Sequence, residues 1–379
     1  MNRRYKIIVD IPKEFNSFSY ILTGLYELNK KNKIDFSFRF TFPKRRKRFI
    51  INEDRKVISD EHHCSMLSYY TLIDRELDIK KRFCIDLTDS SNFYSIDALE
   101  TMDFVFKRSF DKKNNTFLSF ESNSKLHNFG ITVSLRPDKI RLAHKLQLLL
   151  GIFMHCFIDF VKLDGIIFRR LKTWFHKSIS FMDINNVRPL SMFVNPDKHD
   201  NSEKKIFYQK RCFPYEPNED IKSIHIQRFN VVNLLKDHFG EIFIGGLSKS
   251  KIVEEKYLKA ITNLSSVPSE YLKMMNECDI IVYTRGIANS IGFTLPEAFS
   301  QRKVVISERI RNDVPCLLEE GKEVLYFDDD TSLLNAINRV LDDDLLFDSL
   351  RNSGRAYFEE HIHPHKNMER ILKIMGCEI

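Results

Sequence analysis

Short apolar runs alternate with amphipathic stretches along most of this 379-residue chain. In the first half, the run at 5–11 predicts a strand, and the apolar spacing of 17–31 predicts the helix that follows it. The second half repeats this order, with helices between strands that we expect at 206–210, 241–246, 280–284, 303–307 and 323–327. Strands that alternate with helices are typical of an α/β fold with a parallel sheet.

The length of the chain favours two domains over one, because single hydrophobic cores rarely grow to this size. Residues 195–205 (NPDKHDNSEKK) are polar and turn-rich and separate the two halves of the pattern. We therefore predict two Rossmann-like, doubly wound domains with a cleft between them. Their expected bounds are 1–195 and 196–355, and a helical tail at 356–379 is expected to pack back on the first domain.

Residues 139–182 depart from this alternation, because they are long, apolar and basic toward their end. The most apolar part, 146–161, falls short of the roughly 20 residues that a membrane-spanning helix needs. Two interpretations stay open for the stretch through residue 177. It forms buried helices that close the first domain, or it forms a helix that lies on a membrane with its cations at the headgroups.

The charge of the chain is divided unevenly between the halves. Residues 1–190 hold 34 Lys and Arg against 22 Asp and Glu, a net charge of +12, whereas the rest of the chain has 25 against 30. A basic half suggests contact with phosphates or with an anionic membrane surface, although surface charge that only maintains solubility is the alternative. The basic run at 43–49 (PKRRKRF) lacks an accompanying aromatic platform, zinc finger or helix-turn-helix, so we expect no nucleic-acid partner.

The seven cysteines include no Cys-x-x-Cys pair, which indicates reduced thiols in a cytosol. The N-terminus runs into an apolar strand and lacks the features of a signal peptide. We therefore expect a cytoplasmic protein, with peripheral attachment to the inner face of the plasma membrane as an option. His361, His363 and His365 are close in sequence but lack neighbouring cysteines or carboxylates in a ligand pattern, so no metal site is predicted.

The segment that follows the expected strand 280–284 contains residues that are suited to binding an anion. Ligands of open α/β sheets bind at the carboxyl ends of strands, where amides at helix N-termini attract anions. The segment supplies Arg285 and Gly286 and then the free amides that we expect at Ser290, Ile291, Gly292 and Phe293. Thr294 and Glu297 also match a capping box, which explains Glu297 without a ligand.

From Ile206 to Met375 the chain resembles the C-terminal half of bacterial GT-B glycosyltransferases of the capsule and lipopolysaccharide type, the glycosyl transferases group 1-like enzymes. The resemblance is carried by IFYQKRCF, by FNVVNLLKDHFGEIFIGG, by YLKMMNECDIIVYTRGIANSIGFTLPEAFSQRKVVISE and by VPCLLEEGKEVLYF. In the first half it is carried by CIDLTDSSNF and DFVFKRSF. It implies that the second domain binds a nucleotide-sugar donor and the first binds the acceptor.

The resemblance also implies roles for individual residues. Glu297 is expected to bind the ribose of the donor, and Arg211 its diphosphate, with Arg285 as a second candidate. Side-chain cations and helix amides are expected to neutralise the leaving group, so neither a metal nor another cofactor is required. Asn289 stands where many retaining members carry a second glutamate, eight residues before the ribose-binding one, so the resemblance does not assign retention or inversion.

An inverting enzyme needs a general base in the acceptor domain. Asp86 and Asp89 follow an expected strand and are the candidates, although Asp89 also suits a turn or a helix N-cap. Lys107 and Arg108 follow another strand end, where they face the cleft or form a solvated surface pair.

These observations predict a glycosyltransferase of surface polysaccharide synthesis. It would move a sugar from a nucleoside diphosphate donor to a glycan acceptor, which the basic first half suggests is lipid-linked. Two alternatives stay open: a nucleotide-sugar epimerase of the same fold, and a catalytically silent subunit of a polysaccharide-assembly complex.

Overall fold

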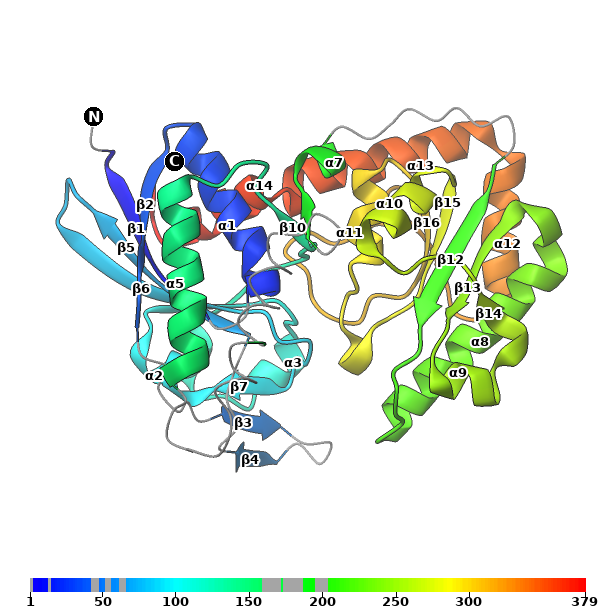
Figure 1. Ribbon diagram of the computed structural model, residues 1–379, viewed down its shortest axis with the longest axis horizontal. Coiled ribbons are helices and arrows are strands. Elements are labelled where there is room, and N and C mark those ends of the chain that lie inside the picture. The colour runs from blue at the N-terminus through cyan, green and yellow to red at the C-terminus, as the bar shows by residue number, and fades with distance from the viewer. Residues whose placement is uncertain are drawn as a thin grey trace. The chain divides into compact units, whose positions relative to one another are not determined.

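The computed structural model describes residues 3–12, 15–41, 48–51, 56–60, 66–158, 172, 187–194 and 204–379. The chain forms two compact units (Figure 1). Unit 1 comprises residues 1–190, 313–315 and 363–379, and unit 2 comprises residues 191–312 and 316–362. Most of the basic run 43–49 and of the expected boundary 195–205 lies outside the described residues.

Unit 2 is built on a six-stranded sheet in which every pair of neighbours is parallel. The strand order is β14-β13-β12-β15-β16-β17. This is the 3-2-1-4-5-6 order of a doubly wound Rossmann sheet. The strands are β12 (Ile206–Arg211), β13 (Phe243–Ser248), β14 (Ile261–Thr262), β15 (Ile280–Tyr283), β16 (Val304–Glu308) and β17 (Leu325–Phe327).

The core of unit 2 explains why two of its strands, β15 and β16, are mostly apolar. All residues of β15 and β16 are buried, because helices cover both faces of a doubly wound sheet. One core cluster joins β12 and β16 to three long helices, α8 (Glu219–Phe239), α12 (Asp330–Asp342) and α13 (Asp344–Tyr357). The remaining helical segments are α7 (Ser191–Val194), η1 (Gly240–Ile242), α9 (Lys251–Lys256), η2 (Leu258–Ala260), α10 (Pro268–Asn276), η3 (Ile287–Asn289), α11 (Thr294–Ser300) and the π-helical η4 (Phe358–Ile362).

Unit 1 contains a mixed six-stranded sheet in the order β2-β1-β5-β6-β8-β9. Strand β5 is antiparallel to both of its neighbours, and the other pairs are parallel. The strands are β1 (Tyr5–Asp10), β2 (Ile34–Arg39), β5 (Leu67–Asp74), β6 (Ile79–Asp86), β8 (Phe104–Lys107) and β9 (Leu126–Asn128). The expectation of a purely parallel sheet is therefore wrong here, because only residues 75–78 join β5 to β6 and a parallel pair needs a long crossover.

Smaller elements complete unit 1. A three-stranded antiparallel sheet has the order β4-β3-β7, and a parallel pair joins β10 to β11. These strands are β3 (Arg48–Ile51), β4 (Val57–Asp60), β7 (Phe93–Ser95), β10 (Leu135–Arg136) and β11 (Arg188–Pro189). The helices are α1 (Phe15–Lys30), α2 (Ile96–Thr101), α3 (Lys112–Asn115), α4 (Phe120–Lys125), α5 (Leu142–Ile158) and α14 (Pro364–Ile374). With two Rossmann-like units, as in the GT-B fold, the predicted α/β fold class is confirmed, whereas the cleft stays a prediction.

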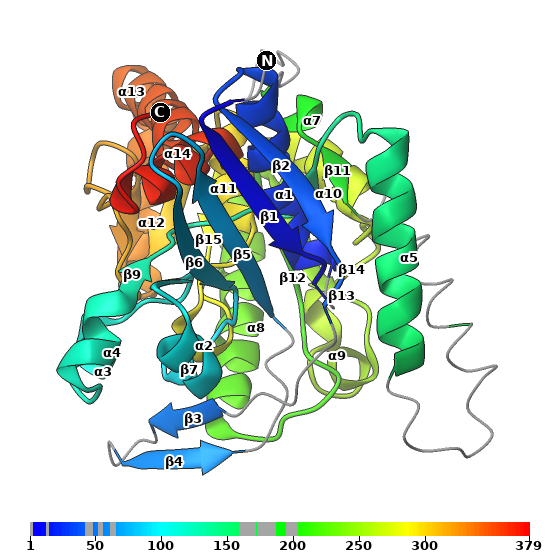
Figure 2. The same cartoon turned by 90° about the vertical axis from the view of Figure 1, so that its left-hand side faces the viewer.

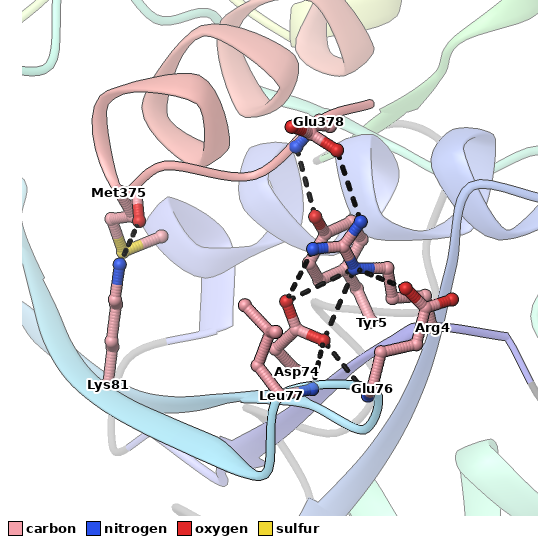
Figure 3. Close-up of polar contacts among 8 residues, drawn as sticks. All are labelled: Arg4, Tyr5, Asp74, Glu76, Leu77, Lys81, Met375 and Glu378. Atoms are coloured by element: carbon pink, nitrogen blue, oxygen red, sulfur yellow. Dashed lines mark hydrogen bonds and ion pairs between the residues drawn. The ribbon is translucent and has the colours of Figure 1, made fainter.

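The C-terminal helix α14 packs against α1 within unit 1 (Figure 2). The approach is close at Gly24, where an added Cβ would lie 2.6 Å from the carbonyl oxygen of Pro364. Hydrogen bonds hold the residues that follow α14 against unit 1 (Figure 3). The backbone amide of Glu378 donates to the Tyr5 hydroxyl at 3.0 Å, and Lys81 Nζ donates to the carbonyl of Met375 at 2.5 Å.

Arg4 connects this C-terminal contact to the turn between β5 and β6. Its guanidinium contacts Glu378 at 3.1 Å and Asp74 at 3.0 Å (Figure 3). The hydrogen bond from Arg4 holds the pKa of the Asp74 carboxyl below its ordinary value of 3.8. Since folding lowers this pKa, the contact stabilises the unit above that value and weakens as the pH falls below it.

Helix α5 covers the first part of the stretch 139–182, and residues 159–171 and 173–182 lie outside the described residues. One face of the helix is buried against the unit, since an added Cβ on Gly151 would lie 2.6 Å from Ile11. Within the described ranges, every helix is too short or too polar to cross a membrane.

Candidate functional site

The carboxyl ends of β12 and β15 meet at the centre of the unit 2 sheet. From β12 the chain continues to β13 on one side, and from β15 it continues to β16 on the other. This reversal is the topological switch point, where open α/β sheets bind their ligands. The Tyr208 hydroxyl, from the middle of β12, and Thr284 Oγ1, directly after β15, lie 2.9 Å apart and connect the two strands.

A partly buried lysine, Lys210, lies at this point. Its ammonium donates to Thr294 Oγ1 at 3.1 Å and lies 5.2 Å from the centre of the Tyr283 ring. Burial lowers the pKa of Lys210 to about 7, and the positive charge of Arg228 acts in the same direction. The carboxylates of Glu297 and Glu308 oppose this shift, which places both among the groups that act on the ammonium.

A buried cation, Arg228, reaches the same strand ends from α8. Its side chain donates to the carbonyl of Arg211 at 2.5 Å and to the carbonyl of Arg285 at 3.4 Å, so it connects the ends of β12 and β15. Only 6% of Arg228 is exposed. Its Nε has no hydrogen-bond partner among the described residues, and burial lowers the pKa of the guanidinium.

The two arginines that were predicted to meet a diphosphate differ in their surroundings. Arg211 ends β12 with an exposed side chain. Arg285 is bound within the protein: its guanidinium donates to Asp220 Oδ1 at 2.5 Å and to Ser223 Oγ at 3.0 Å, and its amide donates to Glu308 at 3.0 Å. These contacts give Arg285 a role in holding the loop after β15.

That loop contains a tight turn from Gly286 to Ser290. The Gly286 amide donates to the Ser290 carbonyl at 2.9 Å, and an added Cβ at Gly286 would lie 2.5 Å from Ser290 Oγ. Ala288 and Asn289 both have left-handed backbones, with φ of 52° and 60°. Asp220 holds the Ala288 amide at 3.0 Å, and Asn289 Oδ1 is buried without a hydrogen-bond partner in the described parts of the chain.

The amides of this loop are less available than the sequence predicts. The Ser290 amide donates to the Ile287 carbonyl at 3.0 Å, and the Gly292 amide donates to the Tyr283 hydroxyl at 2.8 Å. The expectation of free amides is therefore wrong for these two residues. A Cβ on Gly292 would meet only the Tyr283 ring, at ordinary contact distance, so packing of the chain does not require a glycine there.

The predicted capping box is absent from α11. The helix begins at Thr294, and the residue before it, Phe293, has the helical angles φ −65° and ψ −20° and makes no side-chain cap. A side-chain cap needs an extended backbone at the N-cap position. The Thr294 hydroxyl instead contacts Lys210 and, at 3.2 Å, the Tyr271 hydroxyl. Glu297 lies in the first turn and is 4% exposed, so its burial needs an explanation other than a cap.

Around this turn, Ile291 is 9% exposed and Phe293 is 39% exposed. The structure therefore brings Lys210, Arg228, Glu297 and Glu308 together at the switch point. Sequence analysis selected Glu297 but missed both cations, the partly buried Lys210 and the buried Arg228. The sequence could have indicated Lys210, because it adjoins Arg211 at the end of an expected strand. Nothing in the sequence distinguishes Arg228 from the other charged residues of its helix.

The predicted bases of unit 1 have different environments. Asp86 ends β6 and is 4% exposed. One oxygen accepts from Lys107 Nζ at 3.2 Å, and the other accepts from the amide and hydroxyl of Thr88 at 2.9 and 2.7 Å. Lys107 is wholly buried and also donates to the carbonyls of Ser90 and Phe93. The interpretation of Lys107 as part of a solvated surface pair is therefore wrong, because its buried ammonium donates hydrogen bonds to residues of the loop after β6.

Asp89 is exposed, and its carboxylate accepts from Arg108 at 3.0 Å. The structure pairs the four predicted residues as Asp86 with Lys107 and Asp89 with Arg108. Only the second pair presents its carboxylate to solvent.

Two histidines of the C-terminal segment, His363 and His365, contact each other, and His365 also contacts a lysine. Nδ1 atoms of His363 and His365 lie 2.6 Å apart, and Lys31 Nζ lies 2.6 Å from the other ring nitrogen of His365. Burial, followed by the charge of Lys31, lowers the pKa of His365 to about 4. Across the described residues, His, Cys, Asp and Glu form no group of three or more suited to a metal ion.

No protein-family model matches the sequence, and no curated protein matches it. One similar solved structure is an α-glucosyltransferase in complex with UDP, at 13% identity and a TM-score of 0.40, covering 98% of each chain. Another is the C-terminal domain of a glycosyl transferase group 1 family protein from Francisella tularensis, at 13% identity and a TM-score of 0.32, covering 44% of this chain and 94% of that one.

A third similar structure is UDP-GlcNAc 2-epimerase from Neisseria meningitidis bound to UDP-GlcNAc. It has 12% identity and a TM-score of 0.36, and the match covers 74% of this chain and 63% of that one. Because these similarities are low, the fold class is assigned from the strand orders of the two units. Any proposal about a ligand has to be argued from the residues at the switch point.

Proposed function

We propose that this protein is a glycosyltransferase whose unit 2 binds a nucleoside diphosphate sugar at the carboxyl ends of β12 and β15. The observation that carries the proposal is the partly buried Lys210 beside the buried Glu297 at the switch point. An ammonium with a lowered pKa lacks a full counter-charge, and a diphosphate would supply one. A buried carboxylate in the adjacent helix turn can accept hydrogen bonds from both hydroxyls of a ribose.

The cations account for the proposed chemistry. As the glycosidic bond to the donor breaks, negative charge develops on the departing diphosphate. Lys210, with Arg228 behind it and the exposed Arg211 beside it, provides preorganised positive charge at this position. The same charge would otherwise have to come from a metal ion, so we propose a metal-independent reaction.

The acceptor is assigned to unit 1. Asp89 is the preferred general base, because its carboxylate is exposed, whereas that of Asp86 is held by Lys107 and Thr88. We propose a glycan acceptor, carried on a lipid, and a role in surface polysaccharide synthesis. These finer assignments follow from the resemblance of the sequence to capsule and lipopolysaccharide enzymes.

Glu297→Gln tests the donor site, because it removes the charge and retains the shape of the side chain. We expect the affinity for UDP or the matching nucleotide, selected from a nucleotide-sugar thermal-shift panel, to fall by roughly 1–3 kcal/mol in calorimetry. Glu241→Gln is the control, since Glu241 is exposed and precedes β13 at the opposite end of the strands. Unchanged affinity in a folded Glu297→Gln variant would refute the ribose role.

Product analysis without an acceptor separates the alternatives. A transferase leaves the donor sugar unchanged or hydrolyses it slowly, whereas an epimerase converts it. A silent subunit binds the nucleotide or nothing and turns over no nucleotide sugar.

A further inference from the structure

Helix α5 has two apolar faces, and among the described residues of unit 1 one of them is packed while the other is exposed. On the inner face, Leu148 and Ile152 are 1% and 2% exposed, and His155 Nε2 contacts the carbonyl of Ile11 at 2.8 Å. Figure 2 shows α5 beside β2 at the side of the unit. This face corresponds to the core interpretation of the stretch 139–182.

The opposite face carries leucines in contact with solvent. Leu142, Leu146 and Leu150 are 72%, 59% and 62% exposed. Their spacing of four residues places them in one row along the helix. A single exposed leucine is ordinary on a protein surface, but a row of three on one helix face marks an interaction site.

The charges around this row are mainly positive, with three cations against the single exposed carboxylate of Asp138. Lys145 lies on the same side of the helix between Leu142 and Leu146, and Lys139 and Arg141 precede the helix; all three residues are exposed. Residues 142–158 contain neither Asp nor Glu. An apolar row with cations at one end matches the boundary between anionic headgroups and acyl chains.

We propose that this face of α5, defined by Leu142, Lys145, Leu146 and Leu150, docks on an anionic lipid surface with the helix parallel to the membrane plane. A second copy of the chain fits less well, because a symmetric dimer across this row would bring the Lys145 side chains of both copies together. The inference is independent of the donor site, since none of these residues belongs to unit 2. It would hold the enzyme at the surface where a lipid-linked acceptor resides.

Vesicle flotation of the full chain tests the proposal. We expect binding to vesicles of phosphatidylcholine with roughly 30% phosphatidylglycerol, weaker binding to phosphatidylcholine alone, and loss of the difference in high salt. The double variant Leu146→Gln, Leu150→Gln should bind at least about tenfold more weakly, since each leucine loses its transfer into the acyl region. Lys139→Glu with Lys145→Glu should remove the preference for anionic vesicles.

The matched control is Leu258→Gln with Leu345→Gln, two leucines of unit 2 that are 69% and 85% exposed. It should float like the parent protein. UDP affinity should be unchanged in every variant, which separates a failure of this proposal from a failure of the donor site. Equal flotation of the double leucine variant, or no binding of the parent to anionic vesicles, would overturn the proposal. A dimer that the leucine variant converts to monomer, with vesicle binding unaffected, would assign the face to a second copy instead.

Discussion

At the scale of single residues, Lys210 is the group whose protonation connects the candidate site to pH. Its pKa of about 7 means that the ammonium is already charged below that pH and largely neutral well above it. A bound diphosphate favours the charged form, so binding above pH 7 must take up a proton. The unfolded chain keeps the ordinary pKa of 10.5, so this residue also makes stability rise with pH between about 7 and 10.5.

We therefore expect the affinity for UDP to fall as the pH rises above about 7, by up to tenfold per pH unit. Calorimetry at pH 8 in two buffers of different ionisation enthalpy measures the proton taken up. Lys210→Met should bind more weakly and without this dependence, whereas Lys210→Arg should bind without the proton uptake. The same uptake in the parent and in Lys210→Met would assign the proton to another group.

Asp86 and Asp89 can be separated by their different roles. Asp86→Asn leaves the buried Lys107 without its counter-charge and should lower the free energy of unfolding by roughly 3–5 kcal/mol. Asp89→Asn removes the ion pair with Arg108, whose side chain is 9% exposed, but the Asp89 carboxylate itself is 56% exposed, so the loss of stability should be smaller than in Asp86→Asn. If Asp89 is the base, its variant should stay folded and lower turnover roughly 100- to 10,000-fold. Urea denaturation and turnover of the matching donor, measured on both variants, decide the assignment.

At the scale of elements, the turn 286–290 joins β15 to α11 and determines where the helix begins. Ala288 in a left-handed conformation is strained, because its Cβ crowds the following carbonyl. The turn persists since Asp220 holds the Ala288 amide and Ser290 closes the ring of backbone contacts. Strain of this kind is found where a fold positions a ligand-binding segment.

Ala288→Gly should relieve the strain and stabilise the protein by roughly 0.5–1 kcal/mol. The same substitution in a helix, Ala336→Gly in α12, should destabilise it by about 1 kcal/mol, because there the backbone is already relaxed. Urea midpoints of the two variants, compared with that of the parent, provide the measurement. A loss of stability in Ala288→Gly would show that the turn is not strained in solution.

Sequence patterns predict elements best where they are periodic and local. The strands β15 and β16 are mostly apolar runs whose residues are all buried, and α8 ends directly before Gly240. The cap of α11 was predicted wrongly, because the Thr294 hydroxyl has a better partner in a lysine 84 residues away. Strand β5 was not expected, although its hairpin with β6 makes the unit 1 sheet mixed.

At the scale of the whole molecule, the two units are expected to respond differently to a nucleotide. A ligand that binds only the native state slows local opening of the segments it contacts. Saturating UDP should therefore slow amide hydrogen exchange in peptides covering 206–213 and 283–300 of unit 2. Peptides covering 79–86 and 104–107 of unit 1 should exchange as in the free protein. Protection confined to unit 1 would place the nucleotide there and contradict the proposed donor site.

The sequence by itself determined the α/β class, the succession along the chain of five of the six strands in the unit 2 sheet, and the position of Glu297 in the first turn of a helix at a strand end. These follow from patterns within about 20 residues, where local geometry decides which side chains share a face. Only the tertiary structure decided that Lys210 and Arg228 lie near Glu297, and that the Thr294 hydroxyl contacts a lysine instead of capping its helix. It also decided that the Asp86 carboxylate is buried in an ion pair with Lys107. Each of these contacts joins different strands and helices, and which elements become neighbours depends on the packing of the whole sheet.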